Sequence, residues 1–502
     1  MAVIVLAVGL LGCSPEVREQ DETAREGRQE TAGEDRQGIA QEAARPSSDG
    51  SGGEDGAVFT ADGTQRKEGT TPQEAVLSYL AGLRDQDLER MEAAFLDEED
   101  LDGITRQYAV LCGIDQIPEL ASGGPVSIKE RKEAEHLFMQ LEQRIQDTDL
   151  GSIQYRGLLP MEKYLDPSRL ETYQELCAAA AQSDGGDRLE SQVALIGLNG
   201  AEYALFFDTI EIEGRWYIRQ LGGTLAHMMD LDTELAGTLR LDAEDKELLG
   251  QLADGTPGPL PAPWSPISAL QVQEEGYGTP QQAAAAYLEG LKAHDMDQIL
   301  QAFAVEIYAK NYDLQAVMED LGGYLYMQQD VSFPPADDFA TALISRDRRE
   351  QLKKDSLQQG RALYLFSQYL DDAQADPKSW ELDWEELTQK TAPDTIQILG
   401  YIPPEAVYVS DDKKQAYERV NAQKAVHYGA EQIEPCVLVY EQGGKQYSLF
   451  METARYDGSW YAIQFGNVFS LQLGLSADFM GTAPAEMLEE LVDIEEVLMP
   501  IG

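Results

Sequence analysis

Apolar residues recur at helical spacing in two stretches of the chain that are nearly identical. Residues 71–83 read TPQEAVLSYLAGL and residues 279–291 read TPQQAAAAYLEGL. In the first stretch, Val76, Tyr79 and Leu83 lie at the i, i+3 and i+7 positions of one apolar helix face. The threonine and proline that open each stretch are typical of an N-cap and a first helical turn. The pattern therefore predicts the same amphipathic helix in both halves of the chain.

Runs of β-branched and aromatic residues predict a three-stranded antiparallel meander in each half. The runs fall at 193–222 and 436–466, and X-Gly pairs interrupt them. Such pairs favour tight hairpins, because glycine takes a positive φ without steric cost. The tryptophan of the last strand recurs, as Trp216 and Trp460. Because the helix and the meander both recur, we interpret the chain as a duplication of one unit.

Aromatic and amide side chains at matching places in the two halves are the candidate pocket or core residues. They are Tyr79 and Tyr287, Tyr203 and Tyr447, Trp216 and Trp460, and Gln220 and Gln464. Repeated aromatic residues are most often core, which we favour, but a mostly apolar ligand cavity would use the same residue types. Regular alternation along a strand would place Trp216 and Gln220 on one face, with the tryptophan under the first helix. We expect the backbone or the tyrosines of the same unit to supply the hydrogen-bond partners of both glutamines.

These matches divide the chain into two units joined by a spacer. The first unit covers 69–250, a proline-rich linker covers 251–276, and the second unit covers 277–502. Prolines favour an extended linker. The separation between matching residues grows within the second unit, so we predict a helical insertion near 304–395.

The net charge of −52 excludes one class of partner. A chain so acidic repels phosphate backbones, so we expect no nucleic-acid binding. Cys112, Cys177 and Cys436 form no disulfide framework and no metal-binding spacing. Small buried apolar residues are the favoured interpretation of all three, and a bridge between Cys112 and Cys177 stays open.

The N-terminus resembles that of an exported lipoprotein. Residues 1–13, MAVIVLAVGLLGC, are apolar but too short to span a bilayer, as in a signal peptide. The ending LLGC resembles a bacterial lipobox, which implies lipidation of Cys13 and attachment to the extracytoplasmic face of the cell membrane. Residues 14–68 are acidic and poor in large apolar residues, which predicts a disordered linker. A plain signal peptide with an incidental cysteine is the alternative.

The helix and the closing hairpins resemble the nuclear transport factor 2 and ketosteroid isomerase family, whose fold is also called cystatin-like. The matching stretches are AVLSYLAGL at 75–83, EGRWYI at 213–218 and DGSWYA at 457–462. The resemblance implies an α+β fold with two tandem cone-shaped domains, each with N-terminal helices packed on a curved antiparallel sheet. Bacterial lipoproteins often carry such domains. Enzymes of this family work in a conical pocket with an Asp/Tyr or His/Asp set.

No catalytic constellation is apparent in the sequence. It contains no phosphate-binding P-loop, nucleophile elbow or H-E-x-x-H helix. The histidines, His136, His227, His294 and His427, occupy non-equivalent places in the two halves, which disfavours a shared catalytic role. We therefore expect no metal and no cofactor.

Three functions remain open. The favoured one is a membrane-anchored, non-catalytic module that binds an envelope protein, a cell-wall component or a small ligand. The second is an enzyme that acts in the conical pocket, and the third is a structural or regulatory subunit of an envelope assembly. An Asp and a Tyr within hydrogen-bond reach in a polar pocket would favour the enzyme, and a filled interior would favour the other two.

Overall fold

The computed structural model describes most of the two predicted units. The described residues are 69–96, 101–113, 139–140, 142–159, 165–228, 236–241, 260, 274, 276–313, 316, 336–369, 382–407, 410–466, 481–489 and 491–501. They all fall within one compact unit. The predicted signal peptide at 1–13, Cys13, the predicted linker at 14–68 and most of the linker at 251–276 lie outside them.

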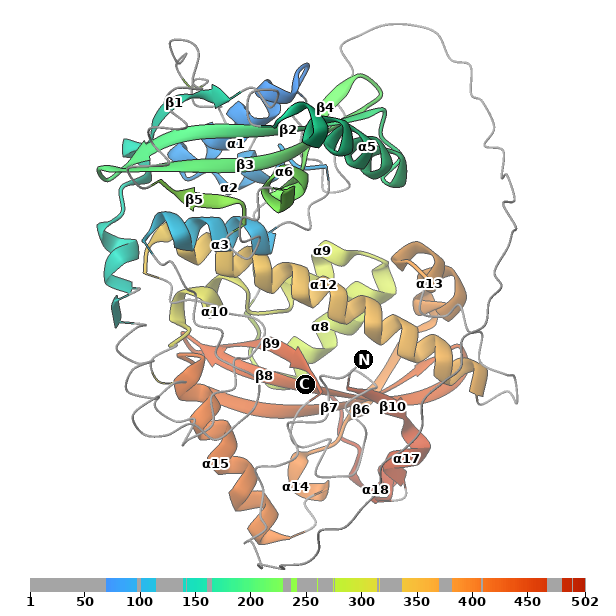
Figure 1. Ribbon diagram of the computed structural model, residues 1–502. Helices are drawn as coiled ribbons and strands as arrows, with labels where there is room; N and C mark the ends of the chain where they lie inside the picture. The colour runs from blue at the N-terminus through green and yellow to red at the C-terminus, as the bar shows by residue number, and fades with distance from the viewer. Residues whose placement is uncertain are drawn as a thin grey trace, which may run out of the picture. The chain divides into compact units, whose positions relative to one another are not determined.

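The first half contains one antiparallel sheet and the helices that cover it (Figure 1). Its helices are α1 (Pro72–Asp85), α2 (Leu88–Glu92), α3 (Leu101–Leu111), α5 (Pro167–Ser183) and α6 (Gly223–Met228). Its strands are β1 (Gln154–Leu159), β2 (Arg188–Leu198), β3 (Ala201–Ile212), β4 (Arg215–Leu221) and β5 (Thr238–Arg240). The sheet order is β1-β2-β3-β4, and β5 also pairs with β3.

The second half repeats this arrangement. Its main helices are α8 (Pro280–Ala293), α9 (Met296–Gln301), α10 (Glu306–Asn311), α12 (Asp338–Tyr369), α13 (Trp384–Thr391) and α15 (Asp411–His427). Shorter helices are α14 (Pro404–Val407), α17 (Ala485–Glu489) and α18 (Ile494–Val497). The strands are β6 (Gln397–Tyr401), β7 (Gln432–Gln442), β8 (Lys445–Tyr456), β9 (Ser459–Phe465) and β10 (Thr482–Pro484). The order is β10-β8-β7-β6, with β9 also on β8. The predicted α+β class is confirmed.

The repeated helix begins as the sequence predicts. The hydroxyl oxygen of Thr71 accepts a hydrogen bond from the backbone N–H of Glu74 at the start of α1, and Thr279 does the same at the start of α8. Gly82 lets α2 approach α1 closely, since a Cβ atom there would lie 2.8 Å from the Met91 side chain. Local sequence therefore fixes both the start of the helix and the packing of the next one.

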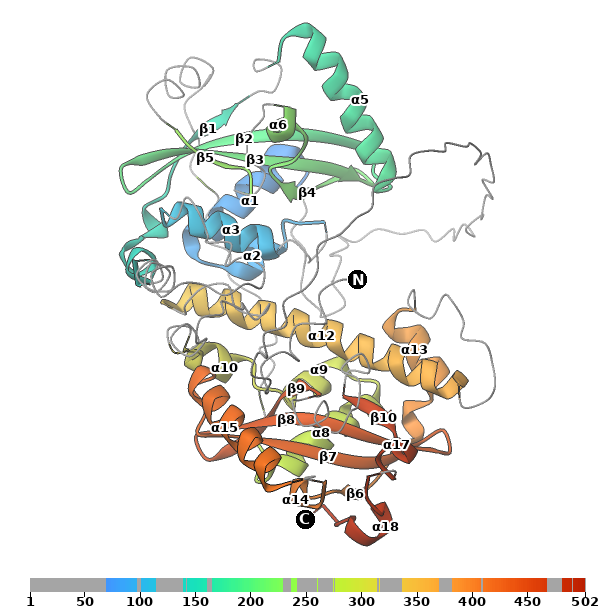
Figure 2. The same cartoon turned by 60° about the horizontal axis from the view of Figure 1, so that its bottom comes forward.

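Each sheet is covered on both faces. Along β3, Leu205 and Phe207 belong to the core that contains α1, while Ala204 and Phe206 belong to the core that contains α5. Figure 2 shows α5 and α1 on opposite sides of the first sheet. This alternation follows the two-residue period of a strand. The face beneath α1 is filled by side chains, whereas a cavity is open on the face beneath α5.

The region predicted as a helical insertion, 304–395, holds α10, α12 and α13. The long helix α12 has 32 residues. Near its start, Arg346 forms an ion pair with Glu92 of α2, with 2.9 Å between Nε and Oε1. Farther along, α12 supplies Leu352 and Leu363 to the core around Tyr287, as α3 supplies Ile104 to the core around Tyr79. Among the described residues, no helix combines the length and the apolar character needed to cross a membrane.

Candidate functional site

The repeated tyrosines of the first helices lie in packed interiors. Tyr79 and Tyr287 are fully buried. The Tyr79 ring meets the rings of Phe95 and Phe207 edge-on, at centroid distances of 5.6 and 5.5 Å. The Tyr287 ring meets the Phe465 ring at 4.9 Å in the same way. Aromatic rings in this geometry fill space efficiently, so both tyrosines act as core residues here.

Each tyrosine hydroxyl begins a short chain of buried hydrogen bonds. Tyr79 donates to Oε1 of Gln107 at 2.7 Å, and Tyr287 donates to Oε1 of Gln359. Gln359 in turn donates to Oγ1 of Thr482 at 2.8 Å. Burial raises the pKa of Tyr287 well above its ordinary value, so this phenol is a donor and not a base.

The sequence analysis missed both glutamines of these chains. Gln107 lies in α3 and Gln359 in the insertion, so they do not match by position. The signal that could have found them is physical, because a buried tyrosine hydroxyl needs an acceptor.

Replacing Gln359 with leucine is expected to lower the free energy of unfolding by about 1–3 kcal/mol, because it removes the acceptor of a buried hydroxyl. Urea unfolding of the full chain measures the change. Gln358→Leu is the matched control, because Gln358 is the exposed neighbour on the same helix. Equal losses in the two variants would contradict a structural role for the Tyr287–Gln359 bond.

The repeated strand aromatics are also buried. Trp216 is 2% exposed and Trp460 is 7% exposed. The backbone of Trp216 exchanges two hydrogen bonds with Gly69, and the Arg188 guanidinium lies 4.9 Å from the centroid of its ring. Tyr203 and Tyr447 are buried on the strands next to these tryptophans.

The prediction that Trp216 and Gln220 share one face of the sheet is wrong. Across β3 and β4, Ile218 lies opposite Thr209 but Gln220 lies opposite Asp208, so Arg219 is an extra residue. A bulge of this kind reverses the alternation beyond it. Gln220 therefore lies on the face beneath α5, while Trp216 lies beneath α1. The same irregularity in β9 places Gln464 opposite Glu452.

The partners of the two glutamines also differ from the prediction. Gln220 donates from Nε2 to Oδ2 of Asp208 at 3.3 Å, and Gln464 donates to Oε2 of Glu452 at 2.8 Å. Both carboxylates are fully buried. Buried carboxylates, rather than backbone groups or tyrosines, hold these amides in place.

The two buried carboxylates are neutralised differently. Lys424 of α15 donates to both oxygens of Glu452, at 3.0 and 2.9 Å. Burial lowers the pKa of Lys424, but the charge of Glu452, the nearby Tyr428 and the hydrogen bonding to Glu452 together outweigh burial, and the net pKa shift is upward. Asp208 instead accepts from the Ser191 hydroxyl and from the backbone N–H and hydroxyl of Thr224, both at 2.9 Å. These donors are neutral.

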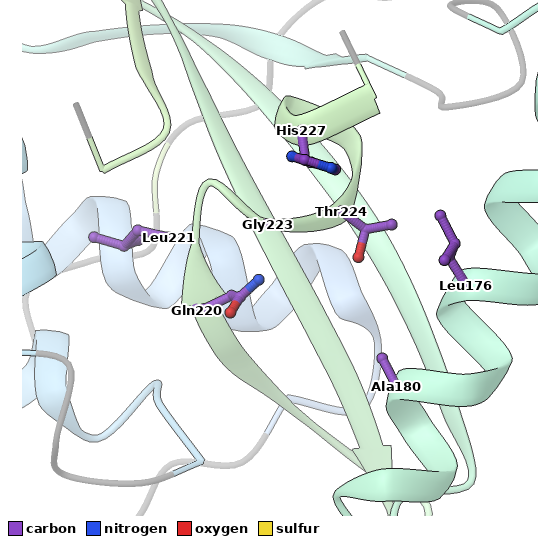
Figure 3. Close-up of a pocket in the computed structure, with 7 residues that line it drawn as sticks. All are labelled: Leu176, Ala180, Gln220, Leu221, Gly223, Thr224 and His227. Atoms are coloured by element: carbon purple, nitrogen blue, oxygen red, sulfur yellow. The ribbon is translucent and has the colours of Figure 1, made fainter. Parts of the chain in front are cut away.

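An open cavity lies next to Asp208 in the first half. Its volume is about 420 Å³, and its walls are Leu176, Ala180, Gln220, Leu221, Gly223, Thr224 and His227. Figure 3 shows Leu176 and Ala180 on α5, facing the polar groups of Gln220, Thr224 and His227. This volume falls within the range of small-molecule sites. Of the sequence-predicted residues, Gln220 alone is in the cavity wall.

Comparison with known proteins gives little beyond this geometry. The chain matches no protein-family model and no curated protein. It is similar to a solved structure, a cystatin-like protein from Ruminococcus gnavus ATCC 29149. The sequence identity is 14% and the TM-score is 0.43, and the match covers 84% of this chain and 94% of that chain.

Among the described residues, Tyr108 and Asp337 form an Asp/Tyr pair within hydrogen-bond reach. Tyr108 of α3 donates to Oδ2 of Asp337 at 2.9 Å. Its ring packs edge-on against Phe339 at 5.1 Å, and Oδ1 of Asp337 accepts from the backbone N–H of Ala340. Tyr108 itself is 1% exposed. The pair therefore joins α3 to the start of α12 and is not in the wall of the cavity.

The remaining candidate groups are the cysteines and the histidines. Cys112, Cys177 and Cys436 are free, buried thiols, and burial raises the pKa of Cys177 to about 11. Within the described ranges, no three side chains of His, Cys, Asp or Glu gather as a metal site. His227 borders the cavity, whereas His294 caps the end of α8. His427 lies in the last turn of α15, and His136 lies outside the described residues.

Proposed function

We propose that this chain is a membrane-anchored, extracytoplasmic lipoprotein that binds a small ligand without chemical turnover. In this proposal two tandem domains similar to nuclear transport factor 2, at 69–250 and 277–502, follow a signal peptide, a lipid on Cys13 and a tether at 14–68. An envelope protein or a cell-wall component is the alternative partner. The lipobox resemblance and the short apolar start support the anchor.

The filled interior beneath α1 and α8 carries the non-catalytic part of the proposal. Enzymes of the resembled fold work in a conical pocket between the first helix and the sheet. In this chain Tyr79 and Tyr287 occupy that space, with their hydroxyls bonded to buried amides. The open cavity lies on the opposite face, beside Ala180. Binding at that cavity fits the mixture of apolar walls and a few polar groups that ligand sites show.

Cys13→Ala is expected to abolish lipidation and membrane attachment, because the thiol of Cys13 is the proposed acceptor of the lipid. The full chain is expressed in a bacterial host, the membrane and soluble fractions are separated, and the mass of the mature protein is measured. We expect the variant to be soluble or to persist as an uncleaved precursor. Ser48→Ala, within the tether, is the control. An unchanged mass and fractionation of Cys13→Ala would refute the anchor.

A further inference from the structure

The two halves place different residues over equivalent buried carboxylates. The helices α5 and α15 both have 17 residues and lie at the same place in the two folds. Ala180 of α5 and Lys424 of α15 stand at the same position along these helices. In the second half the lysine reaches Glu452. In the first half, the methyl group of Ala180 brings no charge to Asp208, and the cavity lies next to Ala180.

The charge of Asp208 is the second element of the site. Removing a carboxylate from water is costly unless a cation or several hydrogen bonds compensate it. The ammonium group of Lys424 neutralises Glu452. The donors to Asp208 carry no charge: they are the side chains of Ser191, Gln220 and Thr224 and the backbone N–H of Thr224. A negative charge thus lies directly behind the cavity wall, bonded to Gln220 and Thr224, which form part of that wall.

The walls of the cavity fit an organic cation. Leu176 and Ala180 supply an apolar side on α5 (Figure 3). Gln220 uses Nε2 to donate to Asp208, which leaves its carbonyl oxygen as an acceptor for a ligand donor. The hydroxyl of Thr224 belongs to the same wall. A small molecule with an ammonium head and a short alkyl chain would match both sides.

We propose that this cavity binds a small alkylammonium ion. Its ammonium group takes the place that Nζ of Lys424 has in the second half, next to Gln220 and in the field of Asp208. Its alkyl chain lies along Leu176 and Ala180. The net charge of −52 further favours the approach of cations. This inference rests on the proposed ligand-binding function and names the chemical class of the ligand.

The test is a titration of the full chain with n-butylammonium chloride, followed by ligand-observed NMR. We expect a dissociation constant on the order of millimolar, as befits so few ligand atoms. The neutral isostere 1-butanol should bind at least tenfold more weakly. Equal binding of the two would overturn the proposal, because the cationic head would then contribute nothing.

Two variants place the site in the first half. Ala180→Lys should weaken n-butylammonium binding at least tenfold, because the new lysine side chain fills the cavity as Lys424 does in the second half. Ala179→Lys is the matched control, because it adds the same charge at the exposed neighbouring position of α5. Equal loss in both variants, or no loss in either, would overturn the assignment to this cavity.

Asp208→Asn tests the source of the cation preference. The amide keeps the size of the side chain and removes its charge, so the tenfold preference over 1-butanol should disappear. A retained preference would overturn the role of Asp208. Thermal unfolding checks that the variant is folded, and Asp184→Asn, at an exposed ion pair with Arg219, provides a second charge-neutralising variant. Loss of amine binding in that variant as well would show a general effect of charge and would also overturn the proposal.

A reciprocal experiment uses the second half. Lys424→Ala should open an equivalent space beside Glu452, and n-butylammonium should raise the urea midpoint of this variant more than sodium does at equal ionic strength. No such rescue would contradict the equivalence of the two sites. Failure of every amine experiment, with Cys13→Ala still releasing the protein from membranes, would overturn this inference and leave the proposed anchor standing.

Discussion

Replacing Lys424 with methionine is expected to lower the free energy of unfolding by about 3–5 kcal/mol, because it leaves the buried carboxylate of Glu452 without a cation. Glu452 is fully buried and receives both hydrogen bonds of the pair, at 3.0 and 2.9 Å. Gln464 remains as a donor but carries no charge. Urea unfolding of the full chain at neutral pH measures the loss. Arg419→Met is the control, because Arg419 lies on an exposed face of the same helix.

The double variant Lys424→Met with Glu452→Gln separates charge from packing. It removes both charges, so it should recover most of the stability that the single variant loses. A double variant no more stable than Lys424→Met would mean that the lysine acts through its packing and not through its charge.

The ion pair also predicts a dependence on pH. The folded-state pKa of Lys424 is raised above its ordinary value of 10.5. A raised pKa means that the stabilisation is fully present below the unfolded-state pKa and is lost as pH rises through the folded-state pKa. The difference in stability between the wild type and Lys424→Met should therefore stay constant up to about pH 9 and shrink at higher pH. A difference that grows above pH 10 would contradict this sign.

Trp216→Ala is expected to cost about 3–5 kcal/mol, as for other large-to-small truncations in a packed core. Trp216 is 2% exposed and belongs to the core beneath α1. Urea unfolding of the full chain measures the loss, and Trp460→Ala tests the equivalent position. A loss below about 1 kcal/mol would mean that Trp216 is not a core residue. Contact with a ligand or a partner would then be the favoured interpretation of Trp216.

Arg188→Ala is the control for the Trp216 variant. Arg188 stacks over the Trp216 ring and forms ion pairs with Glu190 and Glu211. Its side chain is more than half exposed, so these contacts should contribute no more than about 1 kcal/mol. A loss as large as that of Trp216→Ala would assign the effect to the cation and not to the buried ring.

Local sequence was sufficient for the elements that local physics controls. The helix beginning at Pro72 and its counterpart at Pro280 follow from capping residues and apolar spacing. The hairpins of both meanders follow from X-Gly pairs, as at Asn199 and Gly200, which both have a positive φ. In each case the determining residues are neighbours in the chain.

The face of Gln220 could not be predicted in this way. One extra residue in β4, Arg219, reverses which side chains point beneath α5. Whether a strand bulges depends on its register with the neighbouring strand, because the hydrogen bonds of the ladder fix the pairing. The chain therefore specified a glutamine in each half, but only strand pairing placed each glutamine against a buried carboxylate.

The sequence by itself determined that two similar α+β units exist and where the first helix and the hairpins of each unit begin. At matching positions of the sequence, the first half has Ala180 and Asp208 where the second half has Lys424 and Glu452. Only the tertiary structure joined the members of each pair, because the helix and the strand meet across the face of a sheet. The cavity exists for the same reason: the short side chain of Ala180 leaves open the space that Lys424 fills in the second half.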